Sequence, residues 1–109
     1  MFISDAQVQD AFDVLHSPDH AKARAAYEYA EQRIKVAFSK ALLEVKEAKT
    51  ASEREAMARV SDPYQAALKS FHLIAEQYHA ERDRRDAASA VLDAWRTLRS
   101  DARSLGRVA

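Results

Sequence analysis

The stretch EQYHAERDRRDAASAVLDAW, residues 76–95, decides how this chain is organised. Apolar residues recur at helical spacing on both sides of its centre, but residues 81–86 read Glu-Arg-Asp-Arg-Arg-Asp, without an apolar position. A charged run inside a helix is typical of a solvated segment between two packing zones. Ion pairs between residues four apart would support it, here Glu81–Arg85 and Arg82–Asp86.

The composition predicts an all-α fold. Glycine occurs once and proline twice in 109 residues, too few for the turns of a sheet. The length indicates a single domain, and the absence of cysteine excludes disulfides and cysteine-rich zinc sites. No apolar run approaches the roughly 18 residues that span a membrane, and a formal net charge of zero predicts no strong attraction to a membrane. We expect a cytoplasmic protein with no membrane partner.

Start signals divide the chain into four predicted helices. Ser4 and Gln7 fit a capping box, and so do Thr50 and Glu53. Ser17-Pro18 and Ser61-Asp62-Pro63 each place a serine before a proline that tolerates the first helical position. The predicted elements are a short helix over 4–16, a long helix over 18–49, a short helix over 51–60, a long helix over 63–104 and a frayed end over 105–109.

The two long helices are expected to form a hairpin. At 1.5 Å per residue, the helix over 63–104 would be roughly 60 Å long, too long for the rest of the chain to cover. A second copy of the chain would cover both of its apolar halves. We therefore expect a homodimer that forms a dimeric helical bundle.

Catalytic and metal-binding patterns are weak in this sequence. Ser17 lies among histidines and Asp19, but its hydroxyl is needed as a helix cap and no glycine-framed turn would expose it. A carboxylate and two imidazoles share a helix face at His72, Glu76 and His79, and a di-metal bundle would need a second such motif. We expect no catalytic residues, no cofactor and no metal, and keep these three residues as a weak alternative.

Aromatic and arginine residues next to each other are enriched at protein-binding hot spots. We predict that such contacts are made by Tyr78, Arg82, Arg85, Trp95, Arg96 and Arg99. The alternative is nucleic-acid binding, in which phosphates would contact Arg82, Arg85, Arg96, Arg99 and Arg103. Interleaved acids weaken the local field of the first cluster, so this alternative is second.

Two runs resemble a known group of proteins: KTASEREAMARVSDPYQAALKSF (residues 49–71) and RRDAASAVLDAWRTLRSDAR (residues 84–103). They are similar to small helical proteins encoded by tailed bacteriophages and prophages, often in the early region near replication and recombination genes. The group has no assigned activity or catalytic residues, so the resemblance implies a phage-encoded accessory protein and nothing more specific. Residues 1–20 show no resemblance.

Together these observations predict a non-enzymatic interaction protein that binds a host or phage protein of DNA metabolism or defence in the bacterial cytoplasm. Two alternatives stay open. One is a DNA-contacting accessory factor in phage recombination or replication, and the other is a di-metal helical-bundle protein.

Overall fold

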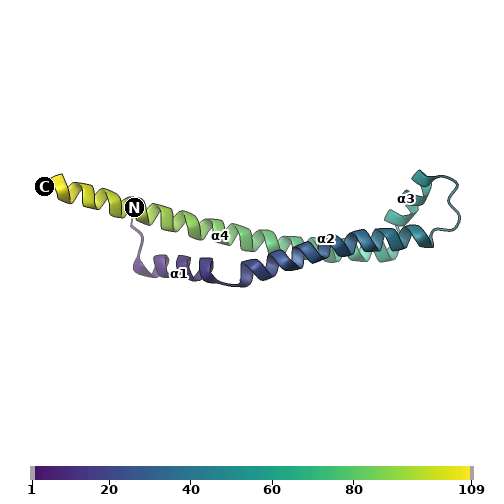
Figure 1. Ribbon diagram of the computed structural model, residues 1–109, viewed down its shortest axis with the longest axis horizontal. Coiled ribbons are helices and arrows are strands. Elements are labelled where there is room, and N and C mark those ends of the chain that lie inside the picture. The colour runs from purple at the N-terminus through teal and green to yellow at the C-terminus, as the bar shows by residue number, and fades with distance from the viewer. Residues whose placement is uncertain (1, 109) are drawn as a thin grey trace. The chain divides into compact units, whose positions relative to one another are not determined.

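The computed structural model describes the backbone of residues 2–108 and the side chains of residues 2–106. This part of the chain contains no strand and four helices: α1 (Asp5–His16), α2 (Asp19–Glu44), α3 (Ala51–Arg59) and α4 (Asp62–Val108) (Figure 1). The all-α prediction is therefore confirmed for these residues.

Two helix ends differ from the sequence prediction by more than one residue. Helix α2 ends at Glu44 instead of residue 49, and its last turn is tightened by a hydrogen bond from the Val45 N–H to the Leu42 carbonyl. Thr50, the N-cap of α3, has an extended backbone, so the helix cannot continue through it. At the other end, α4 stays helical to Val108, where a frayed end over 105–109 was predicted; Ala109 lies outside the described residues.

Capping at the helix starts follows the sequence closely. The Ser4 hydroxyl accepts a hydrogen bond from the Gln7 N–H at 3.1 Å, and the Ser4 N–H donates to Gln7 Oε1 at 2.8 Å. Thr50 Oγ1 accepts from the Glu53 N–H, but the Glu53 carboxylate accepts from the Lys49 N–H and not from Thr50. The first predicted capping box is thus confirmed. In the second, the Glu53 side chain bonds the N–H of Lys49, one residue before the N-cap Thr50.

Replacing Ser4 with alanine is expected to lower the free energy of unfolding by about 1 kcal/mol, because the Gln7 N–H loses its acceptor. Urea unfolding followed by circular dichroism measures this loss. Ser89, an exposed residue within α4, is the matched control, and Ser89→Ala should change stability by less than about 0.5 kcal/mol. Equal stability of the two variants would contradict the capping role.

The chain divides into two compact units where a single domain was predicted. Unit 1 contains the described residues up to His20 and from Ala80 onward, and unit 2 contains Ala21–His79. The boundary in α4 falls immediately before the charged run at 81–86, although the helix itself is continuous there. Because that run has no apolar residue, it offers no side chains that would join the cores on its two sides.

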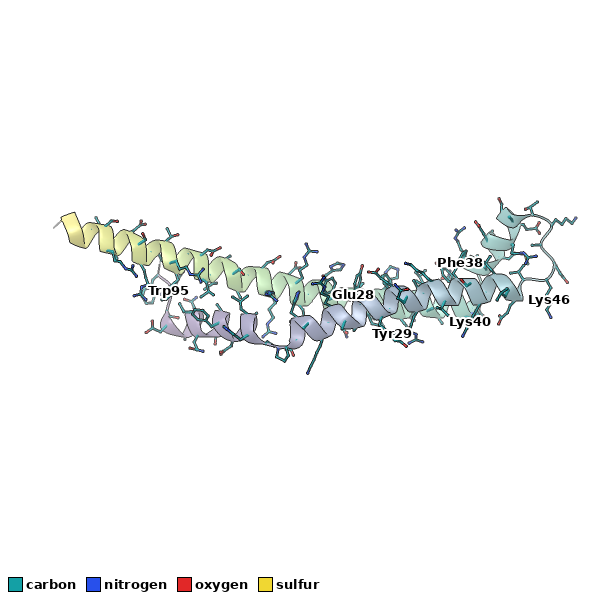
Figure 2. The ribbon with its side chains drawn as sticks, viewed as in Figure 1. Glu28, Tyr29, Phe38, Lys40, Lys46 and Trp95 are labelled. Atoms are coloured by element: carbon teal, nitrogen blue, oxygen red, sulfur yellow. The ribbon has the colours of Figure 1, made fainter. Side chains whose placement is uncertain are left out.

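Unit 1 is built by α1 against the C-terminal part of α4. Its buried cluster consists of Val8 and Ala11 from α1 with Ala88 and Leu92 from α4. Trp95 packs against the cluster from α4 and lies on the side of that helix that faces α1 (Figure 2). The predicted apolar stripe of the first helix therefore faces the predicted stripe in the second half of the last one.

Unit 2 is built by α2, α3 and the N-terminal part of α4. Tyr27 stacks on Tyr78 with 4.7 Å between ring centroids, and Phe38 meets Tyr64 at 5.6 Å. Since residue 27 pairs with 78 and residue 38 with 64, α2 and this part of α4 run antiparallel, as the predicted hairpin requires. Ala58 of α3 is fully buried in the same unit.

The charged run at 81–86 faces the junction between α1 and α2. Arg84 Nη1 lies 4.0 Å from Asp19 Oδ2 at that junction and 3.6 Å from Glu81 Oε1. The structure forms these pairs in place of the predicted Glu81–Arg85 and Arg82–Asp86 pairs. The junction between α1 and α2 presents no apolar stripe for α4 to cover. Charged residues are therefore tolerated on the part of α4 that faces it.

None of the helices within residues 2–108 has both the length and the apolar character needed to cross a membrane.

Candidate interaction surfaces

The weak metal-binding alternative gains no support from the geometry. His72, Glu76 and His79 lie exposed on α4, and His79 contacts the Tyr27 ring at 6.0 Å. Within the described residues, no group of three or more histidine, aspartate or glutamate side chains is arranged to hold a metal ion. A shared helix face is thus not enough here, because nothing from another helix completes the ligand set.

Ser17 has the capping role that the sequence predicts. Its hydroxyl accepts a hydrogen bond from the Asp19 N–H at 3.2 Å, at the start of α2. His16 Nδ1 lies 2.8 Å from the Phe12 carbonyl oxygen, to which it donates. Both side chains satisfy backbone groups at the ends of helices, as structural caps do.

Tyr78 belongs to a different unit from the other predicted contact residues. It is half-buried in unit 2, and its ring stacks on Tyr27. The remaining predicted residues, Arg82, Arg85, Trp95, Arg96 and Arg99, all belong to unit 1. Tyr78 therefore takes part in the packing of α2 on α4 within unit 2.

Trp95, Arg96 and Arg99 come together in an open hollow on α4. The hollow has a volume of about 320 Å³, and its lining also includes Ser100 and Arg103; we call these five residues the basic hollow. The Arg99 guanidinium lies 4.9 Å from the centre of the Trp95 ring, a cation–π contact, and Arg96 Nη1 lies 3.5 Å from Asp93 Oδ1. Ser100, which adds a hydroxyl, was missed because one serine among charged residues carries no pattern.

Arg82 and Arg85 extend this surface along α4. They precede Arg96 and Arg99 by fourteen residues, nearly four helical turns, so they lie on the same side of the helix. Both side chains are exposed. The arginines predicted to contact phosphates thus lie on one side of α4. Only those in the C-terminal half of the helix lie around an aromatic ring.

A second surface, in unit 2, was not predicted. A groove of about 620 Å³ lies between α2 and α4, and its lining includes small residues such as Ala37, Ala41 and Ser70. We call it the α2–α4 groove. Two large residues on its lining are well exposed, Tyr29 at 66% and Val36 at 53%. Tyr29 and Lys40 lie on the opposite side of α2 from Phe38, which faces α3 (Figure 2).

A signal for this groove exists in the sequence. Tyr29, Val36 and Leu43 recur every seven residues on α2, and Leu43 is 81% exposed. A seven-residue repeat marks a second apolar stripe, suited to a further helix. This repeat does not stand out in the sequence, because the stripe beginning at Tyr27 already accounts for one apolar face and many of the other positions of the helix are charged.

Comparison with models of known protein families, with curated proteins and with solved structures found no match for this chain. The phage origin inferred from the resemblance above is therefore not tested by any relative.

Proposed function

We propose that this chain is a non-enzymatic interaction protein that works as a homodimer and binds another protein through the basic hollow. In line with the resemblance described above, the partner would be a host or phage protein of DNA metabolism or defence in the bacterial cytoplasm. Support comes from a thin core combined with an organised, exposed aromatic–arginine surface.

The core is thin because it contains few large side chains. Among the residues whose side chains are described, the buried hydrophobic residues are five alanines with Val8 and Leu92. Large apolar residues such as Leu43 and Leu73 remain exposed. Since burial of large apolar side chains supplies most of the stability of small domains, a chain of this kind gains stability when another protein covers its exposed faces.

The basic hollow supports binding of an acidic protein segment. Tryptophan and arginine are the residue types that most often dominate binding energy, particularly when they lie next to each other. Trp95 is held in place because it packs against the buried cluster of unit 1, so it loses little side-chain freedom on binding. Arg96, Arg99 and Arg103 provide fixed positive charge around the ring.

The same arginines favour a second candidate function, DNA contact in phage recombination or replication. Arg82, Arg85, Arg96, Arg99 and Arg103 share one side of α4 over more than five turns. If Arg96, Arg99 and Arg103 each neutralise a phosphate, affinity for duplex DNA should fall about 40-fold between 50 and 200 mM salt. A protein partner held by Trp95 predicts a much weaker dependence on salt.

Replacing Arg99 with glutamate tests the proposal. In a pull-down from bacterial lysate treated with nuclease, this variant should recover at least about tenfold less of the partner than the unchanged chain, because the cation–π contact and a positive charge are lost. Arg54→Glu makes the same charge change on exposed α3 in unit 2 and should recover the partner normally. Loss of every protein on nuclease treatment would contradict the proposal and favour DNA contact.

A further inference from the structure

The α2–α4 groove combines protruding and receiving features on one face. Tyr29 and Val36 on its lining are large and well exposed, and the lining also includes five alanines and a serine. In a twofold-symmetric interface the same patch is used by both copies, so a patch must be complementary to itself. A large residue beside a row of small ones satisfies this condition, because each copy supplies both the knob and the hole.

The chain exposes more surface than compact proteins of its size, and the excess is close to the area that such an interface buries. The chain of 12.3 kDa exposes 8401 Å². Two separate compact proteins of half this mass would together expose about 7,400 Å². The excess of roughly 1,000 Å² is close to the area of about 800 Å² that each partner contributes to a stable interface.

The charged residues that line the groove are Arg33, Lys40 and Glu44, and the spacing of the outer two indicates the occupant and its direction. Arg33 and Glu44 both line the groove, three helical turns apart on the same side of α2. Neither forms an ion pair within the described residues, and at 1.5 Å per residue they are separated by about 16 Å, too far to meet. An antiparallel copy of α2 centred between Phe38 and Ser39 would place each arginine opposite the other copy's glutamate.

We propose that the α2–α4 groove is the dimer interface, with α2 of a second copy crossing it antiparallel. In this arrangement two equivalent Arg33–Glu44 ion pairs flank the contact. The inference rests on the proposed function, since it names the surface through which the homodimer forms. The zero net charge of the chain favours such an association, because two copies do not repel each other overall.

Light scattering and sedimentation of the purified chain over micromolar concentrations test the interface. The unchanged chain should have twice the mass of 12.3 kDa. Arg33→Glu and Glu44→Arg should each raise the dimer dissociation constant about tenfold, because each replaces two attractive pairs with repulsive ones. The double variant Arg33→Glu/Glu44→Arg should restore it to within about threefold, since the exchanged charges pair again.

Lys35→Glu is the matched control. Lys35 is exposed on α2 but does not line the groove, so this charge change should leave the dissociation constant within about threefold. Circular dichroism of each variant establishes that the helices are intact. A monomer at every concentration, or a dimer that neither single substitution weakens, would overturn the proposal. Weakening by both single substitutions without rescue in the double variant would overturn the antiparallel register.

These results are separable from the test of partner binding. A monomer that still captures a protein through the basic hollow would overturn this interface and leave partner binding standing. A dimer with the predicted charge dependence that captures no protein would support the interface and contradict partner binding.

Discussion

Leu92→Ala is expected to lower the free energy of unfolding of unit 1 by about 3 kcal/mol. Leu92 is 2% exposed and is the largest residue of the buried cluster that it forms with Val8, Ala11 and Ala88. The substitution removes one methine and two methyl carbons from a site that Leu92 shares with Val8 and the two alanines, with Phe12 and Trp95 among the side chains packed against it. Because surrounding groups relax only partly into the space that is left, the cost includes unfilled space as well as lost burial.

The fluorescence of Trp95 provides the readout for Leu92→Ala. It is the single tryptophan of the chain and packs against the same cluster, so its urea-unfolding transition reports on unit 1. Leu105→Ala is the matched control on the same helix, because Leu105 is 73% exposed and should contribute less than about 0.5 kcal/mol. If both variants unfolded at the same urea concentration as the unchanged chain, the assignment of Leu92 to the core would be wrong.

Tyr27→Ala is expected to lower the stability of unit 2 by about 2 to 3 kcal/mol. The Tyr27 ring contacts Tyr78 at 4.7 Å, Phe71 at 5.6 Å and His79 at 6.0 Å, so one substitution removes three ring contacts between α2 and α4. The residue is half-buried, which keeps the expected loss below that of a fully buried aromatic residue.

Circular dichroism during urea unfolding measures the effect of Tyr27→Ala. Tyr27→Phe is the conservative control, because it keeps the ring and removes the hydroxyl alone. It should retain the stability of the unchanged chain to within about 0.5 kcal/mol. An alanine variant as stable as the phenylalanine variant would show that the ring contacts do not hold α2 on α4.

Local signals explain why the helix starts were predictable. Ser4, Ser17 and Thr50 each bond backbone N–H groups within three residues, so the information lies in a few adjacent positions. The end of α2 was not predictable in this way. Val45 and Ala48 continue the apolar spacing, but the chain turns after Glu44 because α3 must return to bury Ala58. Tertiary packing therefore overrides a local pattern that is compatible with helix.

The division into two units follows in part from a feature that the sequence displays. The charged run at 81–86 predicts two packing zones along the last helix, and these exist. Where one zone ends and the other begins also depends on the end of α1. The junction between α1 and α2, just before Asp19, lies opposite Arg84 of the charged run. That match involves residues far apart in the chain, and no local rule reveals it.

The candidate surfaces likewise divide into features that local spacing predicts and features that depend on tertiary packing. Trp95, Arg96 and Arg99 are neighbours along one helix, so their spacing alone brings them together. Tyr78 shares the helix with them, but the position of Tyr27 on α2 decides its role. The α2–α4 groove depends on which side of each helix remains uncovered, and this becomes visible only when the helices are packed.

Native mass spectrometry of the protein isolated from nuclease-treated bacterial lysate would test the central claim most directly, because it weighs every assembly that the chain forms. We predict assemblies that contain two copies of the 12.3 kDa chain and a further protein, without nucleic acid. A bare monomer, or assemblies that contain only this chain and nucleic acid, would contradict the proposal that this chain acts by binding proteins through its exposed helical faces.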